Sequence, residues 1–187
     1  MHRHDGFFLR LTLGPGAGVV GLDAKRALDD TAFAGLGWAS SLDIGGSNGD
    51  NLAIFGRLRH ASIANPVVYV DDDEVADAAA TVVSQSMVGV GISYFIMPLN
   101  MYLGAAVGLA VVSGSYKRPN RETLQYDSRV GFGLYAEDGK EWWIADDWGL
   151  GVAARFSFAD AVASDDLPDD SRFGAAFVSV LLSVTYQ

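Results

Sequence analysis

Residues 87–112 read MVGVGISYFIMPLNMYLGAAVGLAVV, a run without a charged side chain. Its hydropathy alone is typical of a transmembrane helix. A helix is disfavoured, because Pro98 and Asn100 interrupt the centre and glycines recur on both sides of them. In a helix interior Pro costs ~3 kcal/mol and each Gly ~1 kcal/mol relative to Ala. The abundance of Val and Ile therefore favours a β-hairpin, with strands of ~10 residues around a short turn at 98–100.

The same two-residue alternation recurs along the chain. From Ala176 to Tyr186 the even positions are apolar, whereas the odd positions from Ser179 to Thr185 are mostly small or hydroxylated. A period of two indicates strands with two different faces. Eight candidate strands show it, at about residues 7–14, 34–39, 52–59, 88–96, 103–111, 129–137, 148–158 and 176–186.

The two faces of these strands differ in a way that decides their surroundings. One face carries bulky apolar side chains, and the other carries Gly, Ala and Ser interrupted by Arg and Glu. A soluble barrel places large apolar residues inside, but glycine and arginine cannot build an apolar core. A transmembrane barrel has an apolar exterior and a polar lumen. We therefore predict an all-β protein, an eight-stranded antiparallel up-and-down transmembrane β-barrel, with a soluble lipocalin-like barrel as the alternative.

Connections between the candidate strands alternate in length. Short turns are expected at 45–50, 98–100 and 145–147, and long connections at about 15–30, 61–84, 113–127 and 159–172. This pattern is typical of outer-membrane barrels with both termini in the periplasm. The prediction is a single domain over residues 1–187, with four extracellular loops and a flexible leader at 1–5. The glycine-rich stretch 14–18 begins the first loop, since it lacks the lysine of a phosphate-binding loop.

Charged residues on the inner face are expected to pair across the lumen. An eight-stranded lumen is about filled by its own side chains, and each buried charge needs a partner. The predicted lumen charge network comprises Arg10, Arg57, Arg59, Arg129, Arg155, Glu137 and Glu141. The alternative for the same residues is a path for protons or ions.

Residues 139–158, GKEWWIADDWGLGVAARFSF, place three tryptophans among charged residues. Trp142 and Trp148 have outward parity, so we expect them, with Tyr186, to form an aromatic girdle at the membrane–water boundary. Trp143 has inward parity and is expected to pack at the periplasmic end. Asp146 and Asp147 belong to the turn before the next strand.

Composition excludes several functions. A net charge of −10 leaves no basic stripe for nucleic acid, and the absence of cysteine excludes disulfides, thiolate metal sites and cysteine nucleophiles. The acidic loop stretches can meet Ca²⁺, Mg²⁺ or the divalent ions that bridge lipopolysaccharide, but their spacing matches no EF-hand and favours a solvated surface. We expect no metal site or cofactor, and we assign His2 and His4 to the leader. The acidic stretches are Asp29–Asp30, 71–74 and 165–170.

His60 and Ser62 have the same parity and are both expected to face lipid. This H-x-S pair is similar to the arrangement in lipid A deacylases, where a carboxylate orients the histidine. Asp72, Asp73 or Glu74 are the candidate carboxylates, because a serine needs an adjacent base to act as a nucleophile. No oxyanion donors can be named, so an interfacial His and Ser are the favoured interpretation.

Four segments resemble a family of small outer-membrane β-barrel proteins from myxobacteria and related Gram-negative bacteria. They are HDGFFLRLTLGPGAG (4–18), NLAIFGRL (51–58), ISYFIMPLNMYL (92–103) and GKEWWIADDWGLGVAA (139–154), the last being the most specific. The resemblance implies an eight-stranded, porin-like barrel in the outer membrane and a cleaved export signal. It implies no activity.

The combined prediction is a non-enzymatic outer-membrane barrel that is structural or presents its four loops at the cell surface. The alternatives are a narrow channel for ions or small solutes and a lipid A-modifying hydrolase that uses His60 and Ser62. The expected partners are outer-membrane lipid and lipopolysaccharide, and we expect a monomer.

Overall fold

The computed structural model describes residues 6–23, 31–48, 51–70, 73–74, 82–97, 99–117, 123–164 and 171–186. Its eight long strands are β1 (Gly6–Asp23), β2 (Thr31–Asn48), β3 (Leu52–Ala64), β6 (Val82–Ile96), β7 (Met101–Lys117), β9 (Gly131–Trp143), β10 (Trp148–Val162) and β11 (Arg172–Tyr186). Three shorter strands are β4 (Val67–Val70), β5 (Asp73–Glu74) and β8 (Thr123–Asp127). No helix within the described ranges is long and apolar enough to cross a membrane.

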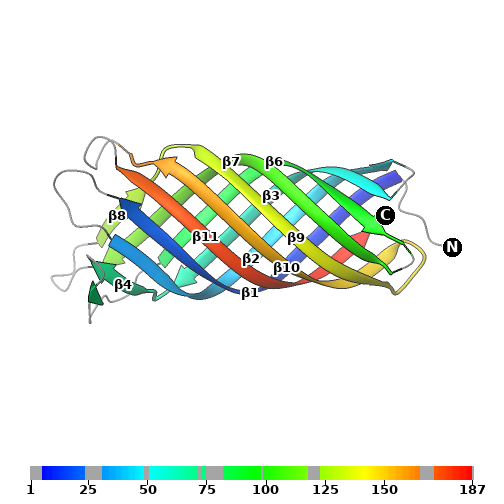
Figure 1. Ribbon diagram of the computed structural model, residues 1–187, viewed down its shortest axis with the longest axis horizontal. Helices are drawn as coiled ribbons and strands as arrows, with labels where there is room; N and C mark the ends of the chain where they lie inside the picture. Colours follow the sequence, from blue (N-terminus) through cyan, green and yellow to red (C-terminus); the bar gives the residue numbers. More distant parts are fainter. Residues whose placement is uncertain are drawn as a thin grey trace.

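The eight long strands form a closed antiparallel barrel (Figure 1). Each pairs with its neighbours in chain order, and β1 closes the sheet on β11 with a register that runs from Leu9↔Tyr186 to Asp23↔Arg172. Closure leaves none of these strands as an unpaired edge, so their backbone polar groups are satisfied within the sheet. The predicted all-β, eight-stranded up-and-down barrel is confirmed.

The short hairpin turns, the start of β1 and the end of β11 lie at one end of the barrel, which we call the terminal end (Figure 1). The opposite end is the loop end. The predicted turns at 98–100 and 145–147 fall between strands, and Asn100 adopts a positive φ of 50° there. The predicted turn at 45–50 is too broad, because Gly45 and Gly46 still pair with Phe55 and Ile54.

The strands are longer than the sequence indicated. They contain 13–18 residues, where ~9–11 suffice to cross a bilayer, so parts of all four predicted long connections belong to strands. The glycine-rich stretch 14–18 is an example, because it lies inside β1 rather than in a loop. Gly14 and Pro15 pair with β2 but are missing from the ladder with β11, as expected where proline has no N–H to donate.

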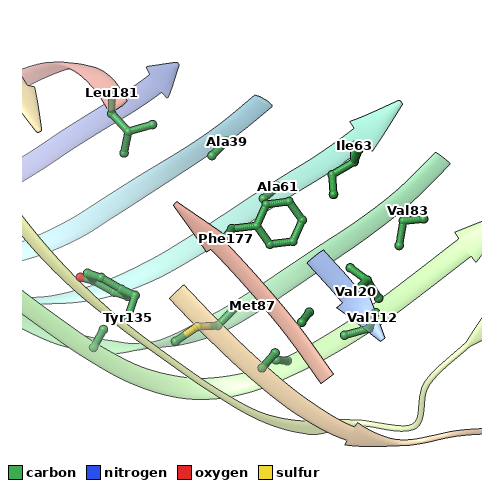
Figure 2. Packing of buried hydrophobic residues seen from close by; sticks show 14 of the residues in the cluster. Val20, Ala39, Ala61, Ile63, Val83, Met87, Val112, Tyr135, Phe177 and Leu181 are labelled. Atoms are coloured by element: carbon green, nitrogen blue, oxygen red, sulfur yellow. The ribbon is translucent and has the colours of Figure 1, made fainter. Parts of the chain in front are cut away.

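The two faces of the wall have opposite character. Bulky apolar side chains point outwards and are exposed, as at Leu36 (81%) and Leu182 (70%). Buried side chains fill the lumen in three layers. An aromatic layer near the terminal end contains Phe8, Phe55, Phe95 and Tyr102; an apolar layer towards the loop end contains Val20, Ile63, Val83, Val112 and Phe177 (Figure 2); and charged residues lie between them. This inverted arrangement excludes the lipocalin-like alternative.

Candidate functional site

Glu137 on β9 joins three strands across the charged layer. Its Oε1 accepts hydrogen bonds from Arg57 Nη2 at 2.9 Å and from Arg10 Nη1 at 3.3 Å. Its Oε2 accepts from Arg155 Nε at 2.8 Å. The three arginines come from β1, β3 and β10 and are at most 1% exposed. One carboxylate therefore ties together side chains from widely spaced parts of the wall.

Asp43 on β2 is a member of this layer that is absent from the predicted charge network. Arg57 Nε donates to Asp43 Oδ1 at 2.5 Å, and Arg57 Nη2 donates to Oδ2, so the pair is bidentate. Asp43 is fully buried. The signal was present, because Ser41 and Asp43 alternate with Leu42 and Ile44, but the predicted second strand ended at 39. The real strand continues to Asn48.

Arg10 and Glu141 form the part of the charged layer that faces the terminal end and the aromatic layer. Arg10 Nη2 lies 3.2 Å from Glu141 Oε1, which also accepts a hydrogen bond from Thr185 Oγ1 at 2.6 Å. The guanidinium carbon of Arg10 is 3.9 Å from the ring centroid of Tyr102, a favourable position for a cation over an aromatic face. The aromatic layer thus supports the charged layer from the terminal end.

Arg155 and Arg59 form the part of the charged layer that faces the loop end. Arg155 Nη2 donates to Thr12 Oγ1 at 3.2 Å and Ser41 Oγ at 3.1 Å. Arg59 Nη1 donates to Gln85 Oε1 at 2.5 Å. Among the described residues, Arg59 forms no ion pair with a carboxylate. Arg59 therefore lies inside the lumen without the acidic partner that its inner-face position predicts, as far as the described residues show.

The predicted position of Arg129 in the lumen is wrong. The alternation of 131–137, when it is extended back to Arg129, predicts a side chain in the lumen. The structure places it before β9, which begins at Gly131, with an exposed side chain and its N–H bonded to the carbonyl oxygen of Val162. Outside the strand, residue parity no longer determines which way a side chain points.

Aromatic side chains gather on the exterior at the terminal end. Trp142 and Trp148 are 49% and 42% exposed, and the rings of Trp148 and Tyr186 are in edge contact at 5.2 Å. Phe7, which the sequence analysis did not include, lies 6.2 Å from Tyr186. Trp143 is half-buried at the end of β9. This position is where an aromatic girdle is expected.

His60 and Ser62 both lie on the exterior of β3, but the structure pairs His60 differently. Its Nδ1 is 3.0 Å from Ser86 Oγ on β6, where the two residues are direct partners in the sheet. The hydroxyl within hydrogen-bond distance of His60 is therefore that of Ser86, and not that of Ser62 as the sequence suggested. The candidate carboxylates 72–74 lie outside the part of the chain whose side chains the structure describes.

The predicted divalent-cation stretches also lie largely outside the described residues, as do His2 and His4. Within the described ranges no group of three or more acidic, histidine or cysteine side chains is placed to hold a metal ion. The acidic residues that the structure does bring together, Asp43 and Glu137, are both paired with Arg57.

Known structures share this fold. The outer membrane protease OmpT of Escherichia coli superposes with a TM-score of 0.53 at 9% identity, covering 100% of this chain and 98% of that chain. Neisserial surface protein A superposes with a TM-score of 0.49 at 11% identity, covering 97% of this chain and 96% of that chain. OprG of Pseudomonas aeruginosa superposes with a TM-score of 0.49 at 10% identity, covering 100% of this chain and 98% of that chain. No family model matches the chain, and no curated protein matches it.

The closed barrel, its apolar exterior and its charged lumen define a β-barrel of the bacterial outer membrane. At identities near 10% these likenesses concern the fold alone. The narrower resemblance to a myxobacterial family stays a prediction. The protease among the similar structures brings no activity to this chain.

Proposed function

We propose that this protein is a non-enzymatic, monomeric barrel with a closed lumen, which presents its loop end outside the cell. The single observation that carries the proposal is the Glu137 carboxylate, which is bonded across the lumen to Arg10 and Arg57 and also to its sheet neighbour Arg155. A conducting pore needs a continuous polar path, and here each buried carboxylate of the charged layer is paired with an arginine.

The layers on either side of the charges support closure. Phe8 stacks on Phe55 with ring centroids 5.5 Å apart, and Phe95 contacts Tyr102 at 5.7 Å. On the loop side, Ile63 and Val83 are at most 2% exposed. An ion would have to cross two apolar layers and separate ion pairs that lie away from water.

Surface presentation rests on the length of the strands. The hairpin of β1 and β2 has 18 residues in each strand, which at ~3.3 Å per residue and a tilt of ~40° rises roughly 45 Å. An apolar band is ~25 Å tall, so the hairpin extends beyond it. β4 adds to β2 and β8 adds to β7 at the loop end. The extension provides a platform for the loops.

Electrical recording tests the closed lumen. We expect the full chain, reconstituted into planar lipid bilayers, to give no unitary conductance steps. Insertion is checked separately by the resistance of the barrel to added protease in vesicles. Steady steps of uniform size would contradict the proposal and favour a narrow channel.

A hydrolase is the second candidate, because His60 Nδ1 lies 3.0 Å from the Ser86 hydroxyl on the lipid-facing side. Such a pair can activate a serine. The purified chain is incubated with lipopolysaccharide, and released acyl chains are measured. We expect no release. Release that Ser86→Ala and His60→Ala abolish, but Ser62→Ala leaves intact, would establish the hydrolase in place of the structural role.

A further inference from the structure

Arg59 differs from the other arginines of the lumen. It is 3% exposed, and within the described part of the chain its one side-chain hydrogen bond is the donation from Nη1 to the neutral Gln85 Oε1 at 2.5 Å. Its Nε and Nη2 are buried without a hydrogen-bond partner among the described residues. A guanidinium offers five N–H donors and no acceptor, so several of its donors point at nothing that the described wall supplies.

Among the described residues, the charges of the layer leave one positive charge without a counter-charge. Four buried arginines, Arg10, Arg57, Arg59 and Arg155, face three buried carboxylates, Asp43, Glu137 and Glu141. All three carboxylates already contact Arg10, Arg57 or Arg155. A buried charge that lacks a counter-charge is strongly unfavourable. The layer therefore calls for one further negative charge, on the side where Arg59 lies.

Other polar groups on that side also lack partners among the described residues. They are Gln85 Nε2, Arg155 Nη1, Ser157 Oγ and Ser179 Oγ. Ser179 is the sheet partner of Arg155, and Ser157 is the partner of Phe177, whose ring centroid lies 5.8 Å from the Arg59 guanidinium. Each of these groups can donate a hydrogen bond. The unpartnered groups on this side are therefore hydrogen-bond donors, and an anion is the kind of ligand that accepts from donors.

We propose that the lumen holds one small monovalent anion at Arg59, with chloride as the physiological occupant and Gln85 and Arg155 as additional donors. The single excess charge favours a monovalent anion over phosphate or sulfate. The apolar layer lies on the loop-end side of Arg59, with Ile63 and Phe177 pointing into the barrel (Figure 2). This layer excludes water and favours a small ion. The anion completes the charge balance of the layer, so it stabilises the closed barrel.

Bromide locates the site directly, because it replaces chloride and scatters anomalously. Crystals of the full wild-type chain grown in bromide are expected to show an anomalous peak within hydrogen-bond distance of Arg59. This measurement needs no variant to fold. Absence of a peak at Arg59 overturns the proposal, and so does a structure in which a carboxylate of 71–74 or 165–170 contacts Arg59.

Unfolding in urea gives the energetic test. Chloride is compared with gluconate at equal ionic strength, with the full chain in lipid vesicles. At a chloride concentration ~100 times the dissociation constant, the folding equilibrium shifts about 100-fold towards the folded state. Arg59→Met removes this chloride dependence, whereas Arg59→Lys keeps part of it. The exposed Arg172→Met is the matched control and keeps it all. Equal stability of the wild type in both salts overturns the proposal.

Discussion

Replacing Glu137 by glutamine lowers the free energy of unfolding by about 3–5 kcal/mol, the usual cost of removing one partner from a buried ion pair. Glu137 is 4% exposed and contacts Arg10, Arg57 and Arg155. Asp43 still compensates Arg57 in the variant, but Arg155 loses its carboxylate partner. The remaining hydroxyl partners of Arg155, Thr12 and Ser41, carry no charge. This is the largest effect that we expect from a single substitution in the lumen.

Urea unfolding of the inserted chain, followed by tryptophan fluorescence, measures this loss. Glu141→Gln is the matched lumen variant and is expected to cost less, because Glu141 contacts Arg10 alone among the arginines, together with Thr185. Asp160→Asn is the exterior control. Its partner Arg172 is half-exposed, so stability is expected to stay within the error of the measurement. A Glu137→Gln chain as stable as the Asp160→Asn chain would show that the network does not hold the lumen together.

The fold could be predicted because its signal is local. An alternation with a period of two is visible within a few residues, and it assigned the outward side chains of all eight strands, including Val88 to Ile96 and Leu103 to Val111. Strand ends were less predictable. Continuation of β2 to Asn48 and of β1 through Pro15 depends on pairing with neighbouring strands, which the local pattern does not contain.

The partners within the lumen depend on information that no local pattern holds. Arg10 and Glu137 are 127 positions apart and meet because the tilt of the barrel brings their levels together. Arg57 and Arg59 lie two residues apart on β3 and point to the same side. Arg57 nevertheless binds Asp43 and Glu137, whereas Arg59 binds Gln85. The sequence therefore identified inner-face charges such as Arg57 and Glu137, but it could not assign their pairs or predict the unbalanced charge at Arg59.

Replacing Val107 by arginine tests the assignment of the exterior to lipid. Val107 lies near the middle of β7, is half-exposed, and pairs with Val90 and Leu134 in a wholly apolar part of the outer face. Arginine on the lipid face at the bilayer midplane costs about 2–4 kcal/mol, because the charge must leave water. In an aqueous setting the same substitution would relieve an exposed apolar patch and cost little.

Val130→Arg is the matched control for this substitution. Val130 is 64% exposed and precedes β9 at the loop end, where arginine costs about 0–1 kcal/mol because the charge stays near water. Unfolding from vesicles in urea measures both variants against the wild type. A clear gap between them supports a bilayer around the middle of the wall. If both arginines were tolerated equally, and the chain stayed monodisperse without detergent, the apolar outer face would need a covering other than lipid.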